Sequence, residues 1–77
     1  MEERVKQVCE IVATACGVDP DKVGPADSQD TVTGWDSVSQ IQIVLELEAA
    51  FGVSLSLEEI VEMRSVADIC ALLGEKV

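Results

Sequence analysis

The chain passes from a turn-rich loop into an amphipathic helix within the stretch GWDSVSQIQIVLELE, residues 34–48. Asp36 belongs to the residue types that cap free backbone N–H groups, so a helix is predicted to begin at Ser37. Gly52 predicts its end at Phe51. The Ser37 hydroxyl then lies at the positive end of the helix dipole, where a phosphate would also meet unsatisfied N–H donors. The first residue of this helix is therefore suited to hold a phosphate ester.

Three further helices are predicted. Apolar residues spaced three and four apart place the first over residues 2–16. A capping box at residues 56–59 predicts a short helix over residues 57–63. The last helix is expected over residues 66–73, with Gly74 as its stop. The chain is therefore predicted to be all-α, a four-helix bundle with a short third helix.

A long loop is predicted between the first two helices. Residues 18–34 contain both prolines and many turn-forming residues. Three valines are expected to pin this loop to the core: Val18, Val23 and Val32. Neither an internal repeat nor a linker divides the sequence, so residues 1–77 are expected to form a single domain.

The composition restricts the partners. The chain has 77 residues and a net charge of −10, which repels nucleic acid and anionic membranes and favours basic protein surfaces. With one Trp, one Phe and no Tyr, the core must be built from aliphatic side chains. We expect a monomer.

The three cysteines are expected to be buried, reduced thiols. Cys9, Cys16 and Cys70 are an odd number, and the chain has no His, which argues against a disulfide framework and a zinc site. A charged N-terminus without an apolar signal segment and the absence of a spanning segment predict a cytoplasmic protein. The start at Met1 and the end soon after the fourth helix favour a free-standing protein.

The helix that begins at Ser37 has two apolar stripes when its residues are placed about 100° apart. The first stripe consists of Ile43, Val44, Leu47 and Phe51, and the second of Val38, Ile41 and Leu45. A small bundle needs one stripe for its core. The second either packs under the long loop or is presented to partners, and we favour presentation.

In its motif, the chain resembles the acyl and peptidyl carrier proteins, whose signature is Gly-x-Asp-Ser-[Leu/Met/Val] at the start of their second helix. Here the motif is Gly34-Trp35-Asp36-Ser37-Val38. The resemblance spans nearly the whole chain. It implies that Ser37 is the attachment point of a 4'-phosphopantetheine arm, whose thiol carries acyl groups as thioesters, and that the chain itself is not an enzyme.

The resemblance also implies the partners. A phosphopantetheinyl transferase would install the arm from coenzyme A, using Mg²⁺ in its own site. Acyl-loading, condensing and modifying enzymes with basic docking surfaces would then visit the thiol. Asp36 is expected to cap the helix and contact the transferase, and Val38, Ile41 and Leu45 are expected to form the docking face.

Family members can shelter an acyl chain between their second and third helices. The positions that resemble this lining are Leu47, Leu55, Ile60, Met63 and Ile69. All five are equally suited to an ordinary core. Ile60 and Ile69 are bulky, so a small cavity and short or polar cargo are expected.

The chain departs from carriers of fatty acid synthesis, whose second helix is rich in Asp and Glu. The matching positions, expected to be exposed, are Ser39, Gln42, Ala49 and Ala50. Because charged rims set partner choice, this departure favours carriers of polyketide, nonribosomal-peptide or other specialised pathways over a housekeeping fatty acid carrier.

The sequence offers three alternatives to a carrier. Residues 19–30 place acids and a glycine as in a calcium-binding EF-hand loop, but position five is a valine and position twelve a short Asp. A nucleophilic Ser37 would need a base, and the chain has no His. A non-enzymatic helical adaptor with an unmodified Ser37 is the more serious alternative.

Overall fold

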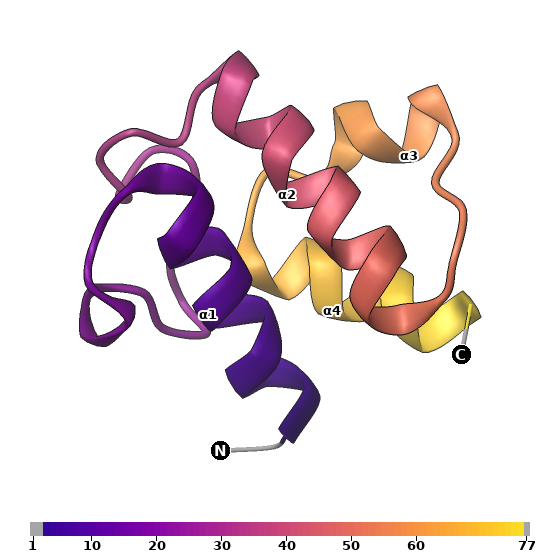
Figure 1. The fold of residues 1–77 in the computed structure, drawn as a ribbon, viewed down its shortest axis with the longest axis horizontal. Coiled ribbons are helices and arrows are strands. Elements are labelled where there is room, and N and C mark those ends of the chain that lie inside the picture. Colours follow the sequence, from indigo (N-terminus) through magenta and orange to yellow (C-terminus); the bar gives the residue numbers. More distant parts are fainter. Residues whose placement is uncertain (1–2, 77) are drawn as a thin grey trace.

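The fold consists of four α-helices and one short 3₁₀ turn in the residues that the computed structural model describes, 3–76 (Figure 1). The elements are α1 (Glu3–Cys16), η1 (Pro20–Lys22), α2 (Ser37–Phe51), α3 (Leu57–Glu62) and α4 (Val66–Lys76). α1 packs against α2 and α4, and α3 lies on the side of α2 away from α1. The all-α bundle with a short third helix is thus confirmed. Within the described part of the chain, no helix has both the length and the apolar character needed to cross a bilayer.

α2 has the boundaries that its caps predict. The Asp36 carboxylate accepts a hydrogen bond from the Ser39 backbone N–H at 2.9 Å. At the other end, Gly52 adopts a left-handed conformation with a φ of 63° and donates to the Glu48 carbonyl. Because a left-handed residue cannot continue the helix, α2 ends at Phe51.

Two predicted helix ends were wrong. α3 ends at Glu62, one residue early, because Met63 has left the helical conformation and acts as its C-cap. α4 continues through Gly74 to Lys76. A glycine ends a helix only where it adopts a positive φ, which Gly74 does not. The ion pair between Lys76 Nζ and Glu59 Oε1, at 3.1 Å, holds the added turn. The predicted start of α1 at residue 2 lies outside the described residues.

The core is aliphatic apart from Trp35, Met63 and one cysteine, and α3 contributes no buried residue to it. Its largest fully buried side chains are Ile43, Leu47, Met63, Ile69, Leu73, Val8, Val12 and Val66. Cys9 is buried, whereas Cys16 and Cys70 are half-buried, so the expected burial of all three is only partly met. Burial raises the pKa of the Cys9 and Cys16 thiols, which keeps them protonated and unreactive.

The long loop between α1 and α2 is held by buried valines and by backbone hydrogen bonds. Val23 and Val32 are buried and Val18 is half-buried, as predicted. The loop also pairs with the link between α3 and α4, a contact that the sequence does not indicate. The Gln29 N–H donates to the Arg64 carbonyl at 2.9 Å, and the Val66 N–H donates to the Asp27 carbonyl at 3.1 Å. Buried side chains and hydrogen bonds therefore fix the loop that leads into α2.

Candidate functional site

Ser37 is the first residue of α2 and is exposed to solvent. We expected a phosphate on its hydroxyl to meet free backbone N–H groups. One of these donors, the Ser39 N–H, is already bound by the Asp36 carboxylate. The helix dipole remains as the favourable field for a negative group at this position. The site therefore offers an accessible hydroxyl on a firmly capped helix.

Asp36 is held in its charged form. The hydrogen bond from the Ser39 backbone N–H places the pKa of the Asp36 carboxyl below its ordinary value of 3.8. A carboxyl group with a depressed folded-state pKa stabilises the fold above its ordinary pKa. The stabilisation by the Asp36 carboxyl is lost as the pH falls through its pKa in the folded state.

We expect the wild type to be more stable than Asp36→Asn at neutral pH. An amide oxygen still accepts the Ser39 N–H, but it lacks the charge that favours the helix start. The difference between their urea midpoints should shrink as the pH falls below about 3.8, because the wild-type carboxyl then becomes protonated. A difference that stays constant over this pH range would contradict the role of the charge.

Ser39 is buried, contrary to the expectation that it would be exposed. Its hydroxyl donates to the Gly34 carbonyl, which ties the first turn of α2 to the preceding loop. Gln42, Ala49 and Ala50 are exposed, as expected. The sequence does not distinguish Ser39 from these positions because a serine suits both a surface and a local hydrogen bond to the backbone.

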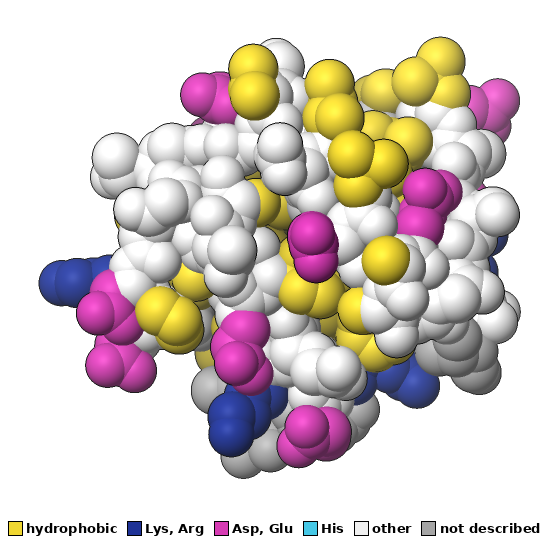
Figure 2. All heavy atoms as spheres, in the orientation of Figure 1, with side chains coloured by type: hydrophobic (Ala, Val, Ile, Leu, Met, Phe, Trp, Pro, Cys, Tyr) yellow, Lys and Arg dark blue, Asp and Glu magenta, His cyan; other side chains and the backbone are white. Residues whose placement is uncertain are grey.

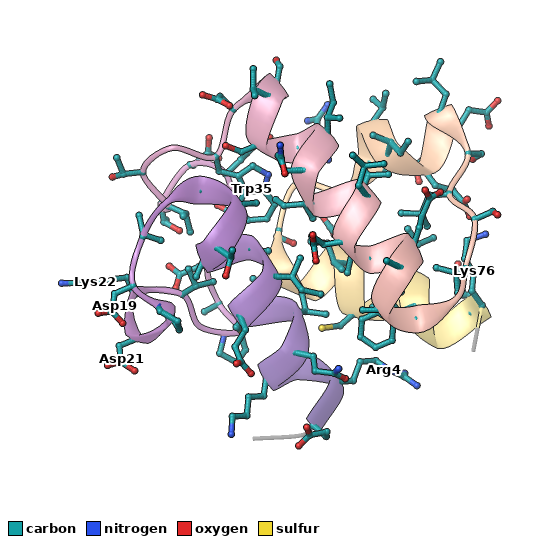
Figure 3. All side chains as sticks on the ribbon, viewed as in Figure 1. Arg4, Asp19, Asp21, Lys22, Trp35 and Lys76 are labelled. Carbon is teal, nitrogen blue, oxygen red and sulfur yellow. The ribbon has the colours of Figure 1, made fainter. Side chains whose placement is uncertain are left out.

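Sequence reasoning missed Trp35 and Gln40. Trp35 is buried between α1 and the start of α2 (Figure 3), and its Nε1 donates to Gln40 Oε1 at 2.7 Å. These residues occupy the positions before the cap and at the fourth residue of the helix, where a hydrophobic staple usually forms. That spacing was the available signal. A staple pair is normally apolar, so the spacing alone does not predict a hydrogen-bonded pair of Trp35 and Gln40.

An open groove borders Ser37 and runs between α2 and α3. Its volume is about 440 Å³, within the range of small-molecule sites. The lining residues are Gln29, Asp36, Ser37, Gln40, Ile41, Ile60, Val61 and Met63. Asp36 is the one charged side chain in this lining. A flexible, largely neutral chain attached to Ser37 can therefore lie in this groove.

The second apolar stripe of α2 is exposed and continues onto α3. The side chains of Val38, Ile41, Leu45, Leu57 and Val61 are between 58% and 76% exposed. We call these five residues the apolar patch. Figure 2 shows hydrophobic side chains gathered over α2 and α3, with acidic side chains at their border and basic ones away from them. The stripe does not pack under the loop, so the presented arrangement is the correct one.

The five positions expected to line an acyl cavity separate into two groups. Leu47, Met63 and Ile69 are fully buried in the core, and Leu55 and Ile60 are half-buried. Ile60 and Met63 also line the groove beside Ser37. Ordinary core packing accounts for Leu47 and Ile69.

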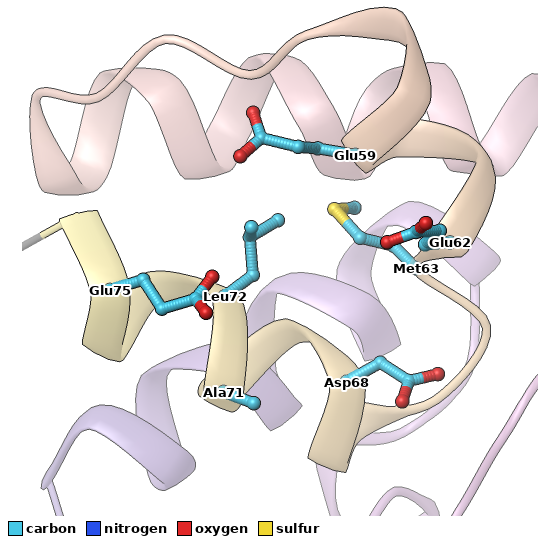
Figure 4. A pocket seen from close by; sticks show the side chains of 7 residues that line it. All are labelled: Glu59, Glu62, Met63, Asp68, Ala71, Leu72 and Glu75. Atoms are coloured by element: carbon cyan, nitrogen blue, oxygen red, sulfur yellow. The ribbon is translucent and has the colours of Figure 1, made fainter.

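A second hollow, of about 210 Å³, lies between α3 and α4 (Figure 4). Its lining is Glu59, Glu62, Met63, Asp68, Ala71, Leu72 and Glu75. Four carboxylates in one small hollow repel a phosphate-bearing group. The hollow is therefore unsuited to the chemistry expected at Ser37.

The acidic loop does not form a calcium site in the structure. The Asp27 carboxylate accepts hydrogen bonds from the Gly24 N–H and the Thr31 hydroxyl, and Asp19 accepts from the Asp21 N–H. These carboxylates thus cap turns of their own loop. Among residues 3–76, no group of three or more His, Cys, Asp or Glu residues is placed to hold a metal ion.

Comparison with known proteins decides the family. The family described as "Phosphopantetheine attachment site" matches residues 6–73. The chain belongs to the phosphopantetheine-binding carrier proteins. Members of this family carry 4'-phosphopantetheine and are carriers, not catalysts, which confirms both expectations.

Three curated relatives support the acyl carrier function. The acyl carrier protein of Thermosynechococcus vestitus is 33% identical over 75 residues, which cover 97% of this chain and 93% of the relative. Acyl carrier protein 1, chloroplastic, of Spinacia oleracea is 32% identical, with 97% and 56% covered. The meromycolate extension acyl carrier protein of Mycobacterium tuberculosis (strain ATCC 25618 / H37Rv) is 29% identical, with 91% and 61% covered. The carrier protein thus spans less than two thirds of the last two relatives.

The residues around Ser37 fit the phosphopantetheine group. The hydroxyl is exposed, the groove beside it is open, and the groove has both apolar and amide-bearing walls. When bound, the group supplies a thiol that holds acyl groups as thioesters. The carrier protein supplies the anchoring hydroxyl and the surfaces around it.

Proposed function

We propose that Ser37 Oγ is the attachment atom for the 4'-phosphopantetheine of this acyl carrier protein. The observation that carries the proposal is the exposed hydroxyl at the first position of a capped helix, inside the region that matches the family. The other serine in the first turn of α2, Ser39, is buried and hydrogen-bonded to the Gly34 carbonyl. Ser39 is therefore poorly suited to accept the phosphopantetheinyl group.

Ser37 acts as the nucleophile in a step that the transferase catalyses. Its Oγ forms a bond to the phosphorus atom on the pantetheine side of coenzyme A, and the diphosphate linkage breaks. Adenosine 3',5'-bisphosphate leaves, and a base of the transferase takes the hydroxyl proton. Asp36, next to Ser37 and charged, is proposed to contact the transferase. The test is intact mass after incubation with coenzyme A and a transferase, followed by fragmentation that locates the added group.

The apolar patch is proposed as the docking face for the transferase and for the acyl-loading, condensing and modifying enzymes. Exposed carboxylates border it from both helices, among them Glu46 on α2 and Glu58 and Glu62 on α3. Charge complementarity then favours a partner surface with an apolar centre and a rim of Lys and Arg. The expected basic surface of the partner corresponds to this rim. The expected docking face of Val38, Ile41 and Leu45 forms part of the patch, to which Leu57 and Val61 are added.

Replacing Ile41 by Ser is expected to lower the kcat/KM of the transferase for this protein by roughly fivefold to thirtyfold. The substitution removes apolar area from the middle of the patch, the equivalent of about 1–2 kcal/mol at an interface. Because Ile41 is 62% exposed, the urea midpoint should change little. Initial rates at varied carrier concentration measure the effect.

The matched control is Ala49→Ser, which lies on the same helix and is exposed outside the patch. It should leave kcat/KM unchanged. If Ile41→Ser and Ala49→Ser behave alike, the transferase does not dock on the patch.

The pathway and compartment remain predictions. The low charge of α2 favours a specialised pathway, such as polyketide or nonribosomal-peptide synthesis, and the bulk of Ile60 and Ile69 favours short or polar cargo. We further propose a monomeric single domain over residues 1–77. A cytoplasmic location is the prediction from the sequence, while the name of the spinach relative places that protein in a chloroplast.

A further inference from the structure

Gln40 joins α2 to the end of α3 through its side-chain amide. Its Nε2 donates to the Ile60 carbonyl and to the Met63 carbonyl, both at 2.9 Å. Its Oε1 accepts from Trp35 Nε1 at 2.7 Å. Both N–H groups of the amide and one lone pair of its oxygen are thus engaged. The side chain is fixed from three sides.

This bridge is important to α3 because the helix itself contributes little to the core. None of its residues is fully buried, and Ile60 is half-buried. The ion pair between Glu59 and Lys76 also ties the helix, and the Gln29 N–H holds the link that follows it through the Arg64 carbonyl. Gln40 supplies a donor to the Met63 carbonyl and a second donor to the Ile60 carbonyl, which also accepts from the Met63 N–H at 3.2 Å. It therefore fixes that end of α3 against α2.

The bridge lies one helical turn from Ser37, where a chain leaving the hydroxyl would turn toward the core. Gln40, Ile60 and Met63 all line the groove beside Ser37. Behind the groove, Ile43 and Leu47 are fully buried. An acyl chain that entered between α2 and α3 at this end would have to break the hydrogen bonds of Gln40. It would also leave Ile60 and Met63 carbonyls without this partner, at a cost in free energy.

We propose that Gln40 is a specificity-determining residue that keeps acyl cargo out of the core, so that the cargo stays in the open groove. This inference rests on the proposed attachment at Ser37. It adds Gln40 to the bulk of Ile60 and Ile69 as a feature that selects short cargo. The reacting thioester then remains accessible to partner enzymes.

The test uses the two methionines of the sequence, Met1 and Met63, as probes. Protein with ¹³C-labelled methionine methyl groups is loaded by a transferase from coenzyme A, butyryl-coenzyme A or octanoyl-coenzyme A. Intact mass confirms each loading before the spectra are recorded. In the wild type, the Met63 methyl resonance and the Tm should be the same in all three forms. In Gln40→Leu, the octanoyl form should shift the Met63 resonance and raise the Tm, and the butyryl form should do so less.

Gln42→Leu is the matched control, since it places the same residue at an exposed position of α2. It should behave like the wild type. If Gln40→Leu does not fold, Gln40→Glu serves instead, because it keeps the size of the side chain and loses the Nε2 donor. The wild-type part of the test does not depend on the folding of any variant.

Two results would overturn the proposal: an octanoyl-dependent Met63 shift in the wild type as large as in the Gln40 variant, or no shift in a folded Gln40 variant. Failure of all forms to gain mass would instead refute the attachment at Ser37. The two failures are therefore distinguishable.

Discussion

Ser37→Ala is expected to gain no mass when it is incubated with coenzyme A and a broad-specificity phosphopantetheinyl transferase, whereas the wild type gains one phosphopantetheinyl group. Alanine lacks the oxygen that must form the phosphodiester bond, so the effect should be complete. Because Ser37 is exposed and Asp36 provides the helix cap, the variant should keep its fold. Intact mass spectrometry measures the gain, and circular dichroism confirms the helices.

The control for this experiment is Ser39→Ala. This variant loses the hydrogen bond to the Gly34 carbonyl and should be less stable by about 0.5–1.5 kcal/mol, yet it should still be modified. A mass gain in Ser37→Ala would place the attachment on another residue. No gain in any of the three proteins would favour an acidic helical adaptor with an unmodified serine.

Gly34→Ala is expected to destabilise the protein by about 2–5 kcal/mol, a large share of the stability of a small domain. Two costs combine. Gly34 has a φ of 89°, a conformation that residues with a Cβ rarely adopt. A Cβ at this position would also lie 2.6 Å from the Cys16 carbonyl oxygen, which belongs to the end of α1 and cannot move without disturbing that helix. The midpoint of urea unfolding should fall accordingly.

Gly52→Ala separates these two costs. Gly52 also has a positive φ, of 63°, but a Cβ there would have no atom within 4 Å. Its replacement should cost only the conformational strain, about 1–2 kcal/mol. If Gly34→Ala proves no more destabilising than Gly52→Ala, the close approach of the loop to α1 does not constrain the site.

Much of the site was predictable because its signals are local. Asp36, the helix start at Ser37 and the stop at Gly52 follow from the preferences of single residues for backbone conformations and hydrogen bonds. The separation of the two stripes of α2 also follows from a regular helical period. The small size of the bundle left two places for the second stripe, and the exposure of Val38, Ile41 and Leu45 decides for presentation.

Two of the predictions that failed concern contacts between one segment and another. Gly74 does not stop α4, since the ion pair of Lys76 with Glu59 on α3 supports the extra turn. Ser39 is buried because the loop carbonyl of Gly34 lies within reach of its hydroxyl. The partner of Lys76 lies on another helix, whereas Gly34 lies close to Ser39 in the sequence and reaches its hydroxyl because of the path that the loop takes into α2.

The sequence by itself determined the helices, the capped serine and the apolar residues beside it, because each depends on neighbours within one or two turns of the chain. Only the tertiary structure decided what surrounds that serine. The burial of Trp35, the continuation of the patch onto Leu57 and Val61, and the bridge from Gln40 to the end of α3 each join segments that the sequence keeps apart. Their arrangement depends on how the helices pack around a shared core, which no local pattern records.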